Sequence, residues 1–255
     1  MIKSLTYLLL FSLLFYACAK TTDNKNHRIS YEIKNFRVES ASGCTSDTMQ
    51  CAYYEVNYPV FSGLDSSVNQ SLVRRIDAAV SMGNPEAEGE SMRQIGEGFI
   101  QDYVNFSKEI TDATGGWYYR ADVKTEVVTD TLLSLSVVEE YFTGGAHGGH
   151  GTYFINIDPR TGADFTLSNL LSPGYEEALT RLGERSFRHV RELPDTASLM
   201  ENYFEFPDDK FALNQNYGFR SDGIVFYYNN YEIAAYAAGP TEVFIPYSEL
   251  KALLR

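Results

Sequence analysis

The chain has 255 residues, 44% of them hydrophobic and 14% aromatic, so it has enough apolar side chains for a folded core and is not wholly disordered. It carries 34 acidic and 21 basic residues, for a net charge of −13. This balance excludes electrostatic binding to nucleic acid, which needs a basic surface. It also argues against peripheral binding to an anionic membrane surface.

The first residues indicate export. Lys3 is followed by a mostly apolar run of 13 residues that ends at Ala17, the size of a secretory signal and shorter than the roughly 20 residues of a membrane span. Ala17 before Cys18 resembles a bacterial lipobox, so residues 1–17 are expected to be a lipoprotein signal peptide, with an acyl (palmitate-type) anchor on Cys18 and a tether over 18–28. A transmembrane anchor or a buried N-terminal helix is the alternative. Cleavage leaves 20 basic and 34 acidic residues, a charge of −14.

Two further cysteines, Cys44 and Cys51, lie between two strand-like runs. In an exported protein a close pair is typical of a disulfide. Free thiols and a metal site are the alternatives, although a zinc site would need two more ligands nearby.

The first half of the chain alternates in a way that predicts strands over 28–38 and 51–61. Apolar residues every fourth position after Asp65 predict a helix, and a second helix is expected from Ser91 to the Gly115–Gly116 pair. Runs rich in Val, Tyr and Thr then predict a hairpin of strands over 117–128 and 132–142.

The second half is again mixed. A glycine-rich loop over 144–151 precedes a strand over 152–157, and a helix is expected over 173–193. That helix would bury Tyr175, Leu179, Leu182 and Val190. The later segments are predicted as follows: a short helix near 199–204, strands over 211–213, 224–228 and 242–245, and a helix over 248–255.

Helices and strands are grouped rather than strictly alternating, which favours an α+β fold with antiparallel sheets and helices packed on one face. We expect two adjacent subdomains: an N-terminal α+β companion domain over 29–130, and a C-terminal α+β domain over 131–255 that carries the Thr-Gly-Gly-Ala-His-Gly motif.

The loop over 143–151 holds two histidines, His147 and His150, among five glycines. Glycines permit a tight connection with positive φ, so the loop is structural in one interpretation. In the others it contacts a ligand, or the two histidines bind a metal with a third ligand not evident in the sequence. No phosphate-binding loop, serine nucleophile elbow or zinc-protease motif is present in the sequence.

A tyrosine-rich run over 227–240 is the other distinctive segment. Tyrosine offers a flat apolar ring with a polar tip, which suits sugars and protein partners. Candidate ligand-binding residues are His147, His150, Tyr228, Tyr231, Glu232 and Tyr236. Threonines of Asp-Thr-apolar triplets resemble O-glycosylation sites of some envelope proteins: Thr48, Thr131 and Thr196.

These runs also carry a resemblance. The motif over 143–148, Thr161-Gly162, the segment 223–240 and Ile245-Pro246-Tyr247 resemble an envelope domain family of unknown function. The family occurs in the extracellular region of an anti-sigma factor that is a lysozyme receptor, and in the N-terminal region of a peptidoglycan deacetylase. Residues 30–110 are similar to its usual N-terminal companion domain. Ala235 departs from the family, which often has proline there.

The resemblance implies an α+β fold and an envelope location, but not lysozyme binding or deacetylation, since the sigma-binding and catalytic parts are missing. We expect a lipid-anchored, non-catalytic binding module, without cofactor or metal, for a cell-wall glycan such as peptidoglycan or for an envelope or host protein such as a lysozyme-like one. A glycan-modifying hydrolase that uses His147 and His150, and a purely structural lipoprotein, are the alternatives.

Overall fold

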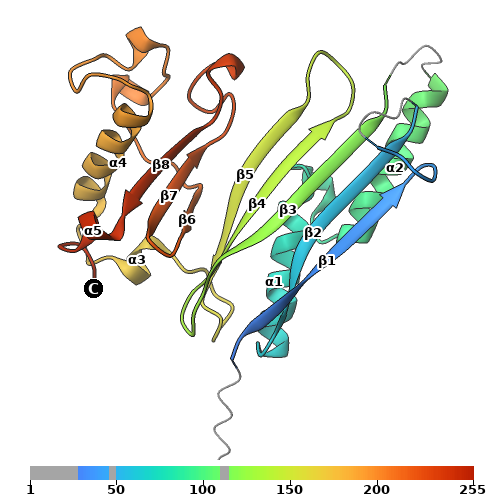
Figure 1. The fold of residues 1–255 in the computed structure, drawn as a ribbon, viewed down its shortest axis with the longest axis horizontal. Coiled ribbons are helices and arrows are strands. Elements are labelled where there is room, and N and C mark those ends of the chain that lie inside the picture. The colour runs from blue at the N-terminus through green and yellow to red at the C-terminus, as the bar shows by residue number, and fades with distance from the viewer. Residues whose placement is uncertain (1–27, 46–49, 110–114) are drawn as a thin grey trace, which may run out of the picture.

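The computed structural model describes residues 28–45, 50–109 and 115–255, which form two sheets side by side (Figure 1). The signal and lipidation predictions, with Cys18, and the glycosylation prediction at Thr48 lie outside the described residues. Within the described part, no helix is both long enough and apolar enough to cross a membrane. The expected α+β class is confirmed, with sheets that are mainly antiparallel and helices against them.

The first sheet has five strands in chain order. They are β1 (Ser30–Glu39), β2 (Ala52–Ser62), β3 (Trp117–Val128), β4 (Leu133–Phe142) and β5 (Gly149–Ile157). All neighbours are antiparallel except β2 and β3, which are parallel. A parallel pair needs a crossover, and here it consists of α1 (Ser66–Ala79), a 3₁₀ turn and α2 (Met92–Glu109).

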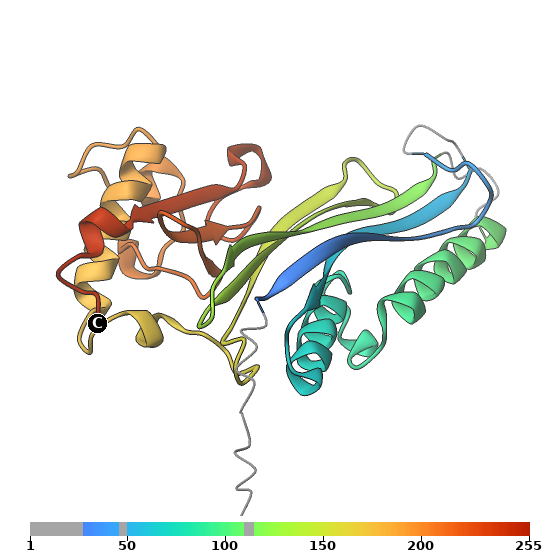
Figure 2. The same cartoon turned by 60° about the horizontal axis from the view of Figure 1, so that its bottom comes forward.

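Both crossover helices cover one face of this sheet and leave the other face open, as Figure 2 shows. The covered face holds the first hydrophobic core. Tyr54 of β2 stacks on Tyr119 of β3 with ring centroids 4.7 Å apart, and its hydroxyl donates to the carbonyl of Val80 at 2.7 Å. Gly96 allows α2 this close, because a Cβ there would lie 2.9 Å from the Tyr54 ring.

The second sheet consists of β6 (Tyr217–Phe219), β7 (Gly223–Tyr228) and β8 (Thr241–Pro246). The helix α4 (Glu176–Val190) packs on it, with α3 (Leu167–Leu170) and α5 (Tyr247–Leu250) at one end. Short 3₁₀ turns occupy Pro85–Ala87, Met200–Asn202, Pro207–Asp209 and Tyr236–Ala238.

Three details of this second subdomain differ from the sequence-based expectation. Val190 is 50% exposed, whereas Phe187 is fully buried in the second core. Residues 211–213 form no strand; Phe211 is buried there by its aromatic neighbours rather than by a strand ladder. The strand β6, which the sequence did not reveal, is only three residues long.

The two sheets are joined through asparagine side chains. Asn156 Nδ2 donates to the carbonyl of Tyr217 at 2.8 Å, and Asn216 Nδ2 donates to that of Thr152 at 2.7 Å. The predicted subdomain boundary after residue 130 falls in the β3–β4 turn, within one sheet. The first sheet continues to Ile157, so in the structure the change of sheet comes after that residue.

The expected disulfide is confirmed between Cys44 and Cys51, whose Cα atoms are 6.0 Å apart. It joins the end of β1 to the start of β2 and packs with Tyr53 and Tyr118 in a small separate cluster. The guanidinium of Arg37 lies 4.1 Å from the Tyr53 ring centroid.

Candidate functional site

The β4–β5 connection and the start of β5 carry both candidate histidines, and the glycines there are required by positive φ or by close packing. Gly144 and Gly145 have φ of 99° and 93°, in the region that favours glycine. Where β5 begins, a Cβ at Gly149 would lie 2.4 Å from Cζ of Tyr141. His147 and His150 are both exposed at the end of this hairpin.

The candidate tyrosines lie at the end of β7 and in the β7–β8 connection, and they differ in exposure. Tyr231 is 66% exposed and adopts φ of 67°, while Tyr228 is buried and donates its hydroxyl to the carbonyl of Ala212 at 2.6 Å. Burial raises the pKa of the Tyr228 hydroxyl. Tyr228 therefore belongs to the core, which corrects its assignment as a surface ligand-binding residue.

Glu232 is exposed, but its carboxylate is engaged both by its own loop and by the segment that precedes β6. It accepts hydrogen bonds from the backbone N–H of Asn229 at 2.9 Å and from Nδ2 of Asn214 at 2.6 Å. These contacts hold the turn that presents Tyr231 and Tyr236. We assign Glu232 to this supporting role.

The remaining candidates converge where the two subdomains meet. The His147 ring stacks on Tyr236 with centroids 4.2 Å apart, and His150 and Tyr231 contact the same tyrosine at 5.9 and 5.5 Å. The Tyr236 hydroxyl donates to the carbonyl of Gly148 at 3.2 Å. We call His147, His150, Tyr231 and Tyr236 the histidine–tyrosine rim.

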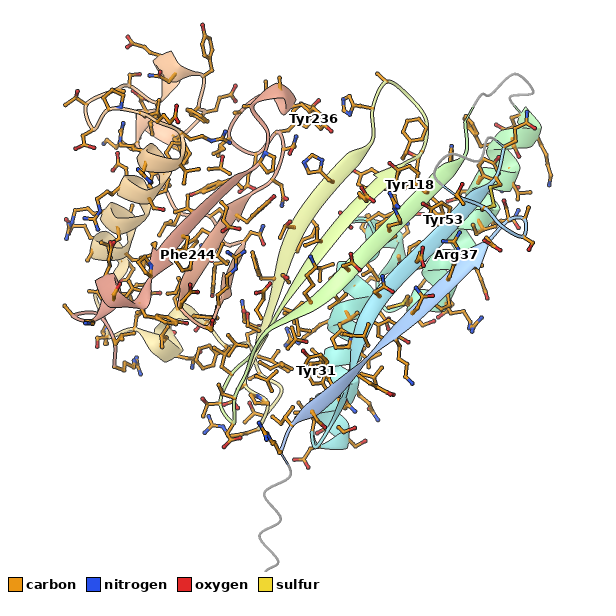
Figure 3. All side chains as sticks on the ribbon, viewed as in Figure 1. Tyr31, Arg37, Tyr53, Tyr118, Tyr236 and Phe244 are labelled. Atoms are coloured by element: carbon orange, nitrogen blue, oxygen red, sulfur yellow. A yellow bond between two sulfur atoms is a disulfide. The ribbon has the colours of Figure 1, made fainter. Side chains whose placement is uncertain are left out.

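Beside this rim lies a polar groove of about 420 Å³ on the open face of the first sheet. Figure 3 views this face, opposite α1 and α2, with Tyr118, Tyr53 and Arg37 labelled on it and Tyr236 beside the far edge. His150 belongs both to the rim and to the groove. The other lining residues come from β2, β3 and β4: Glu55, Asn57, Arg120, Ala121, Asp122, Val138, Glu139 and Glu140.

The groove side chains are ordered by hydrogen bonds across the strands. Asn57 Nδ2 donates to Asp122 Oδ1 at 2.9 Å, and Arg120 forms an ion pair with Glu140. Glu55 pairs with Arg37 at 2.6 Å. Val138 is 37% exposed among these groups. The result is an array of planar donors and acceptors around one apolar patch.

Glu139 differs from the other carboxylates because it is only 4% exposed. Burial raises the pKa of its carboxyl, against the opposing effect of hydrogen bonds from Tyr119 and Tyr153. The Tyr119 hydroxyl donates to Glu139 Oε2 at 2.7 Å. Burial also raises the pKa of the Tyr119 hydroxyl. Glu139 is held beneath the groove as part of the fold.

The histidine loop holds no assembled metal centre within the described residues, where no group of three or more His, Cys, Asp or Glu side chains lies close enough to bind a metal ion. His147 Nδ1 instead lies 2.8 Å from the carbonyl of Gly148. Of the glycosylation candidates, Thr131 in the β3–β4 turn and Thr196 after α4 are both exposed.

Sequence reasoning missed the groove. Its residues occupy alternate positions on strands that are far apart in the chain, such as Glu55 and Asn57 on β2 and Arg120 and Asp122 on β3. The period-2 pattern of polar residues in each strand was the available signal. It did not reveal which part of the polar face stays uncovered.

Comparisons with known proteins agree with this arrangement. Residues 45–150 match the family model described as deacetylase PdaC, and residues 168–248 match that described as a protein of unknown function, DUF3298. A solved DUF3298 family member from Bacteroides fragilis is 23% identical, with a TM-score of 0.66 over 89% of this chain and 95% of that one. One from Pseudomonas aeruginosa is 21% identical, with a TM-score of 0.61 over 90% and 96%. At these identities the likeness concerns the fold. No curated protein matches the chain.

Proposed function

Because the chain carries a PdaC-type domain followed by a DUF3298 domain, we propose that it is a non-catalytic binding module of the bacterial cell envelope. In this proposal the chain is held to a membrane by lipid on Cys18, and its ligand is a cell-wall glycan such as peptidoglycan. The observation that carries the proposal is the polar groove beside the histidine–tyrosine rim.

The chemistry of the groove suits a saccharide. Sugar hydroxyls are both donors and acceptors, and the groove offers carboxylates, an amide and a guanidinium within one volume of about 420 Å³. The exposed surface of Val138 and the rings of Tyr231 and Tyr236 provide apolar contacts for the C–H faces of a sugar ring. Since the groove runs along an open sheet face rather than into an enclosed cavity, it fits a segment of a polymer.

Asp122 and Asn57 offer the sharpest test of this proposal. Asp122 is exposed and the two side chains bond to each other, so replacing both with alanine removes ligand contacts without opening the core. We expect the double variant to bind purified peptidoglycan at least about tenfold more weakly, which corresponds to about 1.4 kcal/mol. Co-sedimentation with insoluble peptidoglycan, titrated over protein concentration, measures the change.

A matched control lies on the opposite side of the same subdomain. Asp102 and Asn105 are exposed on α2, and their double alanine variant removes the same chemical groups far from the groove. It should bind peptidoglycan as the unaltered protein does. Equal retention of both double variants would exclude the groove. Retention of a cationic lysozyme but not of peptidoglycan would replace the glycan by a protein ligand, as the acidic charge of the chain permits.

The anchoring part of the proposal rests on the lipobox-like sequence at Ala17-Cys18. A Cys18→Ser variant keeps the apolar segment but has no thiol to acylate. We expect it to lack the acyl mass increment and to move from the membrane to the soluble fraction or to remain unprocessed. Intact mass after detergent extraction decides, and an unchanged mass with unchanged membrane retention would contradict the lipid anchor.

A further inference from the structure

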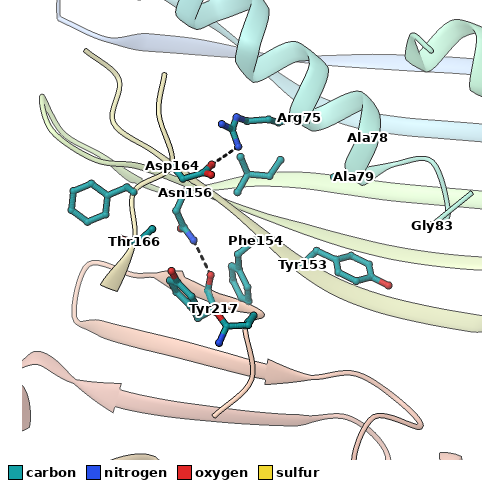
Figure 4. Close-up of a pocket in the computed structure, with 13 residues that line it drawn as sticks. Arg75, Ala78, Ala79, Gly83, Tyr153, Phe154, Asn156, Asp164, Thr166 and Tyr217 are labelled. Carbon is teal, nitrogen blue, oxygen red and sulfur yellow. Dashed lines mark hydrogen bonds and ion pairs between the residues drawn. The ribbon is translucent and has the colours of Figure 1, made fainter. Parts of the chain in front are cut away.

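A second cleft of about 580 Å³ lies between α1, the outer edge of β5 and β6 (Figure 4). It shares no lining residue with the polar groove. Four consecutive residues of β5, from Tyr153 to Asn156, line it. Successive side chains of a strand point to opposite faces. A run of consecutive residues therefore means that the strand turns its edge toward the cleft, which we call the edge cleft.

The backbone groups at this edge point away from β4. Thr152 donates its N–H to Asn229 Oδ1 at 2.8 Å and accepts from Asn216 Nδ2 at 2.7 Å, both from the second subdomain. Further along, the carbonyl of Asn156 accepts from the N–H of Phe165 at 2.9 Å. In an antiparallel strand, residues two apart direct their backbone groups to the same side.

Phe154 lies midway between these two positions, so its N–H and C=O also face outward. Within the part of the chain that the structure describes, no hydrogen bond to either group is found. The side chain is fixed instead, because its ring packs against Gly218 of β6, where a Cβ would lie 2.2 Å from it. The edge cleft thus presents one unpaired donor and one unpaired acceptor on a rigid strand.

The walls of the edge cleft combine small, apolar and aromatic residues with three uncharged polar side chains and one ion pair, so they carry no net charge. Ala78 and Ala79 at the end of α1 form one side, and Tyr217 lies on the other. The single guanidinium, that of Arg75, is neutralised by Asp164 at 2.5 Å. An uncharged ligand with small apolar side chains therefore complements the cleft.

We propose that the edge cleft binds an extended, uncharged peptide segment, which adds to the outer edge of β5 as a short sixth strand. Phe154 donates its N–H to one peptide carbonyl and accepts one peptide N–H, the pattern of strand addition to a sheet edge. Small side chains of the peptide lie against Ala78 and Ala79. The site is independent of glycan binding, since its lining residues are separate.

The test uses a blocked pentapeptide, acetyl-Ala-Val-Ala-Val-Ala-amide, and the same peptide methylated at every internal nitrogen. Amide exchange of the isotope-labelled protein is followed by NMR. At saturation with the plain peptide, exchange of the Phe154 N–H should slow by at least about tenfold, because it becomes hydrogen-bonded. The methylated peptide cannot donate an N–H to the Phe154 carbonyl, and its N-methyl groups hold it away from the strand edge, so it should bind too weakly to protect the Phe154 N–H.

Two variants on α1 locate the effect. Ala78→Trp fills the edge cleft from an exposed position and should abolish protection, whereas Ser67→Trp in the first turn of the same helix should leave it unchanged. Equal protection by the methylated peptide, protection that survives Ala78→Trp, or no protection of Phe154 by the plain peptide at millimolar concentration would each overturn the proposal. None of these results bears on peptidoglycan retention, so the two proposals fail separately.

Discussion

Replacing Phe187 with alanine is expected to lower the free energy of unfolding by about 3–5 kcal/mol, the largest effect of any single change considered for this protein. Phe187 is fully buried on α4. Its ring contacts Phe204, Phe206 and Phe211 with centroids 5.1, 5.4 and 5.3 Å away. Alanine would leave a cavity lined by rigid rings that cannot collapse into it.

Thermal unfolding followed by calorimetry measures this loss, which should lower the melting temperature by about 10 °C for a chain of this size. Val190→Ala is the matched control, because Val190 lies three residues further along the same helix and is half exposed. Its effect should stay within about 0.5 kcal/mol. Similar losses in both variants would mean that Phe187 is not the centre of the second core.

Removal of the Glu139 side chain should produce the second large effect. Glu139→Ala leaves the Tyr119 hydroxyl buried without its acceptor, at a cost of about 1–3 kcal/mol, in addition to the cavity. Glu139→Gln keeps an oxygen that accepts this hydrogen bond but cannot ionise. We therefore expect the glutamine variant to be markedly more stable than the alanine variant in urea unfolding at neutral pH.

The same glutamine variant changes the pH dependence of stability. Burial raises the pKa of Glu139 in the folded chain, so the folded state holds the proton more tightly than the unfolded one. The stabilisation that this tighter proton binding gives is fully present below the ordinary carboxyl pKa. It is lost as the pH rises through the raised pKa of Glu139 in the folded chain. Glu139→Gln removes this decline.

Comparing the two proteins isolates Glu139 from other groups. Burial also raises the pKa of Asp77, so Asp77 makes the free energy of unfolding fall with rising pH in both proteins. The hydrogen bond from Arg160 lowers the pKa of Asp158, which has the opposite effect on that free energy in both proteins. The difference in free energy of unfolding between Glu139→Gln and the unaltered protein should thus grow from acidic to neutral pH. A constant difference would show that Glu139 ionises in the folded chain as it does in the unfolded one.

The groove lies on the part of the first sheet that neither the helices nor the second subdomain covers. The covered face of the first sheet is stabilised by apolar and tyrosine side chains against α1 and α2. The open face is partly covered by β6, where the Phe219 N–H donates to Ser134 Oγ at 3.1 Å. The uncovered remainder keeps its charged side chains in contact with water. Binding there needs no unfolding of either subdomain.

The sequence alone determined the local features of this protein. The strands β1 and β2 show alternating side chains, and the helix after Asp65 has an apolar residue at every fourth position. Both patterns reflect contacts between residues close in the chain, so the periodicity of the sequence revealed these elements. The close spacing of Cys44 and Cys51 made their pairing foreseeable. The motifs around 143–148 and 223–240 carried the family resemblance because their glycines and turns are required by local geometry.

Only the tertiary structure decided which of these residues meet. His147 and Tyr236 are 89 positions apart and stack because the two subdomains are fixed by Asn156 and Asn216. Tyr228 and Tyr231 are three positions apart, yet one is core and the other surface, since Tyr228 ends β7 and Tyr231 lies in the turn that follows, with φ of 67°. The groove and the edge cleft depend on strand register and on which face the second subdomain covers. Those are long-range contacts, and no local pattern encodes them.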